Sequence, residues 1–232
     1  LGEIGRNMMV IEDDQDIVII DCGVMFPENE MLGVDLVIPD VTYLASRLDR
    51  IRGVILTHGH EDHVGALPYI LPQLAFPPLW ATPLTAGLIS GKLREHRLAD
   101  RVQVNLIDPA DPVAFGGFIA EFFHVCHSVP DGVGVALRTP AGTVVHTGDF
   151  KFDHPPVDGR PTDYGKLAEV GRQGVLCLFS DSTHADRPGH TPSERVIDDA
   201  FERIFASAEG RIIVTTFASL ISRVQQVIDA AV

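Results

Sequence analysis

The sequence is poor in the features that mark secreted and membrane proteins. Only three of its 232 residues are cysteines, Cys22, Cys126 and Cys177, and they lie far apart. They predict buried thiols in a reducing compartment rather than a disulfide framework. No apolar run approaches the roughly 18 residues that a membrane helix needs, and no basic segment followed by an apolar one stands at the start. We therefore expect a cytoplasmic protein with no membrane partner.

Basic residues are also scarce. The chain has 18 lysines and arginines against 32 acidic residues, and its formal net charge is -14. Long-range repulsion therefore opposes the approach of a polyanion, so a nucleic-acid ligand would require bound cations or a confined basic surface. The segment 92–97, with Arg101 nearby, predicts such a surface. A solvated helix face is the alternative interpretation of the same residues.

The order of apolar runs indicates the fold class. The apolar share of 45% and the charged share of 22% are those of a globular protein, which excludes a disordered or fibrous chain. The short β-branched runs that predict strands are 8–11, 17–22, 54–57, 79–81, 102–107, 118–125, 133–138 and 143–147. The helix-like segments between them are 40–48, 64–74, 83–98 and 163–170. Because strands and helices alternate, we expect an α/β or α+β fold with a mixed sheet.

The pattern changes near the end of the chain. The run 175–179 predicts a buried strand. Thr-Pro-Ser-Glu at 191–194 predicts the start of a helix that ends near Ala208. Another strand is expected at 211–217.

This change predicts two domains, at 1–173 and at 174–232, the second of them incomplete. The chain begins without Met and ends in an apolar helical stretch that has no cap. We therefore expect a fragment of a longer protein.

A dense group of metal-binding side chains follows one of the expected strands. Its members are His58, His60, Asp62 and His63. Gly59 lets the chain turn tightly, so that both neighbouring imidazoles point to one side. Imidazole nitrogen with carboxylate oxygen is a ligand set that zinc and similar ions accept. A polar, solvated turn is the alternative interpretation.

These residues cannot saturate two ions alone, so more distant ligands are required. His127 follows the strand expected at 118–125, whereas His124 lies within it. A histidine at a strand end is also commonly structural. Asp149 follows a glycine turn at the end of another strand, where a simple turn aspartate is the alternative.

Motifs along the chain resemble those of the metallo-β-lactamase superfamily, in their usual order. They are His-Gly-His-Glu-Asp-His at 58–63, the single His127, and Thr-Gly-Asp at 147–149. Flanking sequences resemble the ribonuclease J family within this superfamily, and the resemblance covers essentially the whole chain. These flanking sequences are LGEIGRNM at 1–8, LGVDLVIPD at 32–40, HTGDFKFD at 146–153, SDST at 180–183 and FAS at 217–219.

The resemblance implies a centre with two divalent metal ions, with zinc as the first expectation and manganese as the alternative. The implied ligands are His58, His60 and His127 for one ion, Asp62 and His63 for the other, and Asp149 for both. Asp21 matches the family's first acidic motif, which braces the ligands from behind through hydrogen bonds. A strand-ending aspartate that stabilises a turn is the alternative for Asp21.

The resemblance also implies residues for catalysis and substrate binding. Asp62 and Asp181 are the implied catalytic acids, and Asp181 matches the acid at the start of the inserted β-CASP domain. Ser219 and Arg223 are expected to contact phosphate or the RNA backbone, with a helix cap and a solvated cation as the alternatives. The positions that depart from the family's usual asparagine are Leu220 and His184.

The fold that the resemblance implies is an αββα sandwich followed by the start of a β-CASP α/β domain. The implied reaction is hydrolysis of RNA phosphodiesters by a hydroxide that two metals share. It would act as a 5′-to-3′ exoribonuclease and endoribonuclease in mRNA decay and rRNA processing. The implied substrate is single-stranded RNA, preferably 5′-monophosphorylated, and the intact protein is expected to be a homo-oligomer. Because the family's later histidines would lie beyond Val232, the fragment itself is expected to be inactive.

Two other interpretations stay open. One is a different metal hydrolase on the same scaffold, such as a glyoxalase II-like thioesterase, a β-lactamase or a DNA nuclease. The segment after Gly174 argues against the first two, because those enzymes do not need it. The other is a catalytically silent RNA-binding scaffold, against which the set of ligand-type residues argues.

Overall fold

Two β-sheets face each other in the computed structural model, which describes residues 4–232. The first sheet has the order β1 (Met9–Glu12), β2 (Ile17–Ile20), β3 (Ile51–Leu56), β4 (Leu79–Ala81), β5 (Val104–Leu106). Only β1 runs antiparallel to its neighbour there. The second has the order β10 (Cys177–Phe179), β9 (Gly142–His146), β8 (Val133–Thr139), β7 (Phe118–His124), β6 (Val113–Phe115). It is antiparallel except where β10 joins β9.

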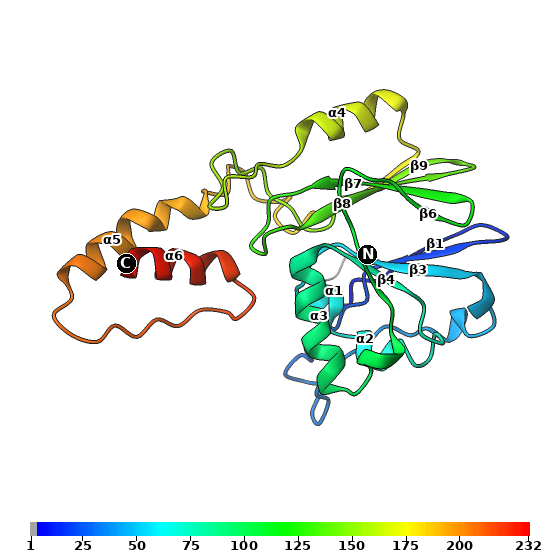
Figure 1. The fold of residues 1–232 in the computed structure, drawn as a ribbon, viewed down its shortest axis with the longest axis horizontal. Coiled ribbons are helices and arrows are strands. Elements are labelled where there is room, and N and C mark those ends of the chain that lie inside the picture. The colour runs from blue at the N-terminus through cyan, green and yellow to red at the C-terminus, as the bar shows by residue number, and fades with distance from the viewer. Residues whose placement is uncertain (1–3) are drawn as a thin grey trace.

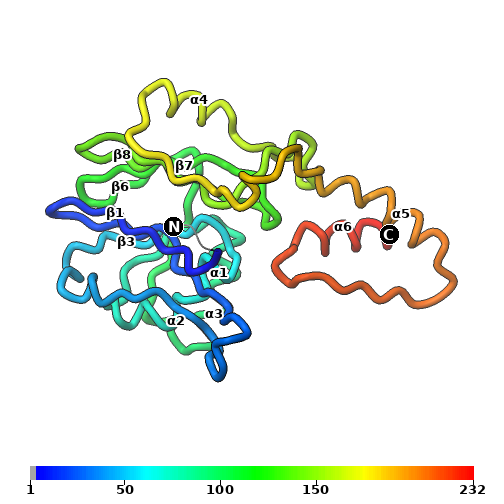
Figure 2. The backbone as a smooth tube through the Cα atoms, turned by 180° about the vertical axis from the view of Figure 1, so that it is seen from behind, coloured from blue at the N-terminus to red at the C-terminus, as the bar shows by residue number. Residues whose placement is uncertain are grey.

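Helices cover the outer face of each sheet (Figure 1). The first sheet carries α1 (Glu61–Val64), α2 (Leu67–Ile70) and α3 (Pro83–Glu95), and the second carries α4 (Tyr164–Gln173). The αββα arrangement expected from the sequence is therefore confirmed. The last two helices, α5 (Asp198–Ser207) and α6 (Ile221–Ala231), pack on each other beside the sandwich (Figure 2). Among residues 4–232, no helix is both long and apolar enough to cross a membrane.

Strand β2 shows why the two sheets and their helices assemble. All of its side chains are apolar and buried. Because side chains alternate between the two faces of a strand, Ile17 and Ile19 pack in the cluster under the helices, and Val18 and Ile20 pack against the second sheet. From that sheet Phe122 enters the same inner cluster. Each such side chain contributes about 1.5–3 kcal/mol by leaving water.

The strand expected at 211–217 is wrong. The segment is irregular, and Ile213 and Phe217 are 83% and 84% exposed. Apolar β-branched residues favour a strand, but a strand also needs a neighbouring backbone to complete its hydrogen bonds. No strand within the described part of the chain pairs with this segment.

The run 175–179 is a strand only in part, and its expected burial is wrong. Cys177–Phe179 forms β10 at the edge of the second sheet, and Leu178 is 59% exposed. An apolar run predicts burial only when both faces of the strand are covered. The expected boundary after residue 173 would assign β10 to the second domain, but β10 pairs with β9 in the second sheet of the sandwich. The position of the domain boundary stays a prediction.

Two further segments differ from expectation. The helix expected at 40–48 is wrong, because the chain forms only the short 3-10 turns Thr42–Leu44 and Leu48–Arg50 there. The helix expected at 64–74 divides into α1 and α2, and strand β6 was not predicted. Residues 1–3, part of the 1–8 motif used above, lie outside the described residues.

Candidate metal centre

The candidate ligands lie at one end of the sandwich, where several strands end. β2 and β3 are parallel, so their carboxyl ends lie at the same edge. In the second sheet, β7 and β9 both run antiparallel to β8 and therefore point the same way. The residues that follow these strands are Asp21 after β2, His58 and His60 after β3, His127 after β7, and Asp149 after β9. The topology thus brings together side chains that are distant in the sequence.

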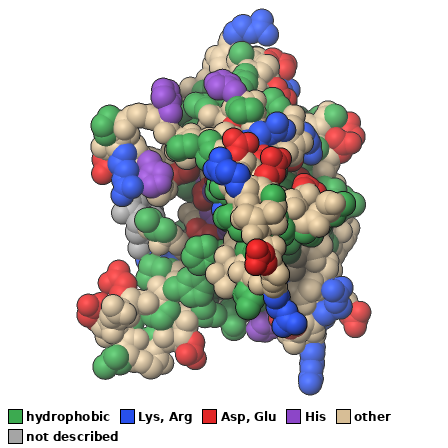
Figure 3. Space-filling view, turned by 90° about the vertical axis from the view of Figure 1, so that its left-hand side faces the viewer, with side chains coloured by type: hydrophobic (Ala, Val, Ile, Leu, Met, Phe, Trp, Pro, Cys, Tyr) green, Lys and Arg blue, Asp and Glu red, His purple; other side chains and the backbone are tan. Residues whose placement is uncertain are grey.

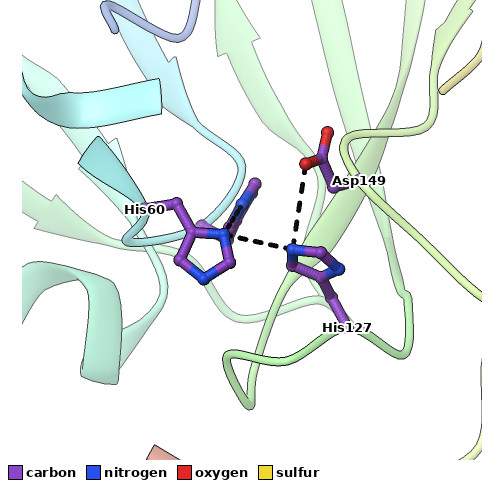
Figure 4. Close-up of side chains that lie close together, drawn as sticks. His60, His127 and Asp149 are labelled. Carbon is purple, nitrogen blue, oxygen red and sulfur yellow. Dashed lines mark hydrogen bonds and ion pairs between the residues drawn. The ribbon is translucent and has the colours of Figure 1, made fainter. Parts of the chain in front are cut away.

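One group of ligand atoms converges around His60 (Figure 4). Its Nδ1 lies 3.0 Å from Nε2 of His58 and 3.1 Å from Nε2 of His127. Asp149 completes the group, with Oδ2 at 3.8 Å from Nε2 of His127. Zinc–nitrogen bonds of about 2.0–2.1 Å in a tetrahedral site place two nitrogens about 3.3 Å apart. Donor type and spacing therefore fit a divalent ion such as zinc.

A second group shares Asp149 with the first. Nε2 of His63 lies 3.3 Å from Oδ1 of Asp149 and 3.6 Å from Oδ2 of Asp62. One ligand atom from each of these three residues lies within 4.8 Å of the others. The two oxygens of Asp149 thus face different groups. This is the geometry expected of a carboxylate that bridges two ions.

Asp21 lies behind the ligands rather than among them. It is 1% exposed, and its Oδ2 accepts a hydrogen bond of 2.7 Å from Nδ1 of His63. Its Oδ1 accepts the backbone N–H of Thr57 at 2.8 Å. The Thr57 hydroxyl lies 3.1 Å from Nδ1 of His58. One carboxylate therefore orients ligands of both groups, as outer carboxylates commonly do at metal sites.

Sequence reasoning missed two residues that contact the ligands from outside, Thr57 and Asn7. Thr57 ends the strand before the histidine motif and was treated only as part of that strand. Asn7 donates a hydrogen bond of 3.2 Å to Oδ2 of Asp62 and lies 3.0 Å from Nε2 of His63. The only signal for Asn7 was its place in the 1–8 motif.

Burial favours the neutral form of three proposed ligands, because it lowers the pKa of His58, His60 and His127. It lowers the pKa of His58 well below the usual value, and the nearby His63 and His127 add to the effect. Burial also lowers the pKa of His127 to about 4. The imidazoles of His58 and His127 are therefore uncharged near pH 7 and offer a lone pair, as metal ligation requires.

His63 behaves in the opposite way. Burial opposes its protonation, but Asp21 and Asp149 raise its pKa well above the usual value. Burial likewise opposes ionisation of Asp149, but the hydrogen bond and charge of His63 lower the pKa of that carboxyl. A protonated His63 therefore pairs with an ionised Asp149, and an incoming metal must displace this proton.

Two glycines allow the chain to pass close to these ligands. A Cβ on Gly23 would lie 1.5 Å from the backbone oxygen of Asp62, so only glycine fits between this strand end and α1. Gly148 has a φ of 59° and turns the chain just before Asp149. Other residues rarely adopt that conformation.

Asp181 lies beside the second group. It lines a cavity of about 440 Å³ together with Asp62, His63 and Asp149. Its Oδ1 accepts hydrogen bonds from the backbone and the hydroxyl of Thr183. The structure therefore brings Asp181 to the edge of the site but does not place it within either ligand group.

Thr147 joins the Asp181 turn to the Asp149 turn. Its hydroxyl donates to the backbone oxygen of Gly148 at 2.6 Å and accepts from the backbone N–H of Asp181 at 3.1 Å. Its own N–H donates to the backbone oxygen of Phe179 at 3.0 Å. The end of β9 and the end of β10 are therefore held together at the site.

The structure does not bring the expected substrate-binding residues to this centre. Ser219 and Arg223 are half-buried, but neither lines the 440 Å³ cavity. The Arg223 guanidinium pairs with Glu194 and donates to Gln226 at 3.0 Å. Ser222, which was not predicted, has its hydroxyl 3.5 Å from the backbone oxygen of Ser128 and lines a small cavity together with His127.

The segment 92–97 does not form a purely basic surface. Lys92 pairs with Glu61 at 2.8 Å, and Arg101 stacks on the Phe76 ring. In the face shown in Figure 3, Lys and Arg side chains are scattered among acidic ones. The negative net charge is therefore not offset by one large basic patch on that face.

Comparison with known families agrees with this architecture. A family model described as the metallo-β-lactamase superfamily matches residues 1–213. A ribonuclease J of Helicobacter pylori strain J99 is 49% identical over 99% of this chain and 33% of that protein. Ribonuclease J2 of Bacillus subtilis is 44% identical over 100% of this chain and 41% of that protein. The chain thus spans about a third to two fifths of the length of these curated relatives.

Solved structures share the fold at low sequence identity. A protein of unknown function from Enterococcus faecalis matches with a TM-score of 0.67 at 17% identity, covering 97% of this chain and 60% of that one. Human tRNase Z, short form, matches with a TM-score of 0.51 at 14% identity, covering 86% of this chain and 82% of that one. At such identities the likeness concerns the fold alone.

Proposed function

Because the chain belongs to the metallo-β-lactamase superfamily, we propose that its histidine and aspartate groups bind two divalent metal ions and that the intact protein hydrolyses RNA phosphodiesters. The observation that carries the proposal is the position of Asp149, whose two oxygens face two separate ligand groups. Its support in sequence is similarity along the whole chain to proteins named ribonuclease J. The proposal extends to the intact protein, because these relatives are longer than this chain.

The proposed ligands follow the two groups. They are His58, His60 and His127 for one ion, Asp62 and His63 for the other, and Asp149 for both. Two such ions lower the pKa of bound water to about 7 and offset negative charge at a phosphoryl group. The mixed nitrogen and oxygen donors favour zinc, and manganese is the alternative.

The other residues of the chain orient these ligands and the substrate. Asp21 holds His63 and, through Thr57, His58. We place Asp62 and Asp181 as acids that face the substrate, since both line the 440 Å³ cavity. Ser219 and Arg223 remain proposed contacts to the RNA backbone. Arg223 would have to exchange its pair with Glu194 for a phosphate.

We further propose that residues 174–232 begin a β-CASP domain, and that the intact protein is a cytoplasmic homo-oligomer. Its proposed substrate is single-stranded RNA, preferably with a 5′-monophosphate, cut by both 5′-to-3′ exonuclease and endonuclease action in mRNA decay and rRNA processing. The metals partly offset the acidity of the chain near the substrate. The support for these points is similarity along the whole chain to proteins named ribonuclease J.

The test is cleavage by the intact protein of labelled 5′-monophosphorylated RNA, with single-stranded DNA and a thioester as rival substrates. Cleavage of RNA should stop when the metal is chelated and return with added zinc or manganese. His58→Ala should abolish it, whereas His96→Ala, which changes a histidine packed on Tyr69, should leave it intact. Preference for DNA or the thioester would favour another hydrolase. RNA binding without metal or cleavage would favour a silent scaffold.

A further inference from the structure

A small cavity is lined by His127 and by none of the other proposed ligands. Its volume is about 20 Å³. Its polar lining includes His124, His127, Lys151, Asp153, Asp158 and Ser222. A polar cavity of more than roughly 10–15 Å³ holds one water when it offers that water at least two partners.

Asp153 is the unexplained group of this cavity. It is 4% exposed, and neither of its carboxylate oxygens has a hydrogen-bond partner among residues 4–232. The Lys151 ammonium lies 3.6 Å from Oδ2, too far for a hydrogen bond. A buried carboxylate without hydrogen bonds is costly, so a native structure normally supplies a partner or a water.

His127 has a ring nitrogen that would need a hydrogen-bond acceptor. Its Nε2 faces His60 and Asp149, so its Nδ1 points away from His60 (Figure 4). No hydrogen bond to this Nδ1 is found within the described residues. A metal-binding histidine almost always donates its second N–H to a carboxylate, a carbonyl or a water, which fixes the tautomer and the ring orientation.

The backbone holds the two segments side by side. The N–H of Lys151 donates to the backbone oxygen of Cys126 at 2.8 Å. The Cys126 sulfur lies 3.8 Å from the backbone oxygen of Asp153. The segment that carries His127 therefore contacts the segment that carries Asp153. Both residues line the same cavity.

We infer that this cavity holds one ordered water, which accepts a hydrogen bond from Nδ1–H of His127 and donates one to the carboxylate of Asp153. Asp153 is then a positioning residue for His127, as Asp21 is for His63. The inference rests on the proposed function, because it takes His127 as a metal ligand. It assigns to Asp153 a role in the geometry of the first ion and none in contact with substrate.

The first test measures metal affinity of the intact protein by titration of the metal-free form with cobalt or zinc against a competing chelator. Asp153→Asn keeps the shape of the side chain and removes its charge. It should weaken the tighter binding step about 10- to 100-fold, as loss of an outer partner does, and change the visible spectrum of the cobalt form. Glu194→Gln is the matched control, because Glu194 is the other carboxylate beside Lys151 at 3.2 Å and does not line the cavity. Its affinity should equal that of the wild type.

The second test needs no metal. Nitrogen chemical shifts of the His127 ring in the metal-free protein should show the Nδ1-protonated tautomer, and Asp153→Asn should mix the two tautomers. A crystal structure of the wild type should show the water between His127 and Asp153. An empty cavity, or an Nε2-protonated His127, overturns the inference even if the variant fails to fold.

The outcomes separate this inference from the proposed function. If the wild type binds no metal, the proposed function fails, and the tautomer and the water still decide the role of Asp153. If the wild type binds metal and Asp153→Asn binds it equally well, the inference fails and the proposed function stands. Equal losses in Asp153→Asn and Glu194→Gln would assign the effect to Lys151 and overturn the inference.

Discussion

The sandwich and the segment that follows it differ in how completely they bury their apolar side chains. Every member of the buried clusters lies at or before Val170. In the last two helices and the segment between them, large apolar side chains stay exposed, among them Ile204, Phe217 and Ile228. Gln226 is the one buried residue there within the described chain. All proposed metal ligands belong to the first region, and both proposed RNA-backbone contacts belong to the second.

The difference in packing favours separate roles for the two regions. A dinuclear site needs ligand atoms fixed to a few tenths of an ångström, and a closely packed core supplies this rigidity. The later segment is joined to the sandwich by a few polar contacts, such as Lys151 with Glu194 at 3.2 Å. We therefore expect metal binding to depend on the first region and substrate handling on the second.

The largest expected effect comes from Asp149. Among the described residues, Asp149 is the one side chain that belongs to both groups. Asp149→Ala removes it, so metal affinity and RNA cleavage should fall by more than the roughly 100-fold that loss of an outer partner costs. Asp181→Ala should reduce cleavage yet leave metal content unchanged, since Asp181 belongs to neither group. Metal analysis and cleavage assays on the intact protein check both. Loss of metal in Asp181→Ala would contradict the assignment of Asp181 to substrate handling rather than to metal binding.

The packing contrast is tested by two phenylalanines. Phe122 is 2% exposed between the sheets, whereas Phe217 is 84% exposed. Phe122→Ala should reduce the free energy of unfolding by about 3–5 kcal/mol, because it removes buried surface and leaves a cavity. Phe217→Ala should change it by less than about 0.5 kcal/mol. Denaturant unfolding measures both, and a large loss in Phe217→Ala would show that the second region is packed in solution.

Two glycines sharpen the comparison at the backbone. Gly23→Ala places a Cβ against the backbone of Asp62 and should cost about 1–3 kcal/mol of stability. It should also weaken metal binding by shifting α1. Gly210→Ala meets no atom within 4 Å and should leave thermal stability and metal affinity unchanged. A tolerated Gly23→Ala with normal metal binding would contradict the close approach.

The smallest effect concerns Asp16, which ties the two sheets together. Its carboxylate accepts the N–H of Gly117 at 2.6 Å and pairs with Arg52. The Gly117 hydrogen bond and Arg52 lower the pKa of Asp16. The folded pKa is below the unfolded one, so this stability is present above about pH 4 and is lost as pH falls through the folded pKa.

Asp16→Asn should therefore be less stable than the wild type at pH 7, and the gap should narrow below about pH 4. Thermal unfolding across this pH range measures it. The control is Asp186→Asn in the second region, where the side chain is exposed and no change is expected. A gap that stays constant with pH would contradict the assigned hydrogen bond.

The sequence predicts the convergence of ligand-type side chains better than it predicts the later segment, for a physical reason. Residue type and close spacing within one short motif identify His58, His60 and His63 as candidate ligands. Asp149 is identified by its position after a glycine turn. The convergence of His127 with them requires the strand order, which local patterns do not encode. For 211–217, β-propensity predicts a strand, but pairing depends on a neighbouring backbone that no local signal reveals.

Asp153 marks another limit of sequence reasoning. Its place in the 146–153 motif was used only for family resemblance, and no role was predicted for it. Only burial shows that its oxygens lack partners. Asp21 was inferred from resemblance, and its hydrogen bonds to His63 and Thr57 give that inference a geometric basis.

Thr147 couples the turn that carries Asp149 to the chain that follows β10. The hydroxyl hydrogen-bonds both the carbonyl of Gly148 and the amide of Asp181, so the turn that presents Asp149 and the chain beyond β10 share this one side chain. A shift of the chain beyond β10 would therefore reach the shared ligand through Thr147, by its hydroxyl and by its backbone N–H to Phe179.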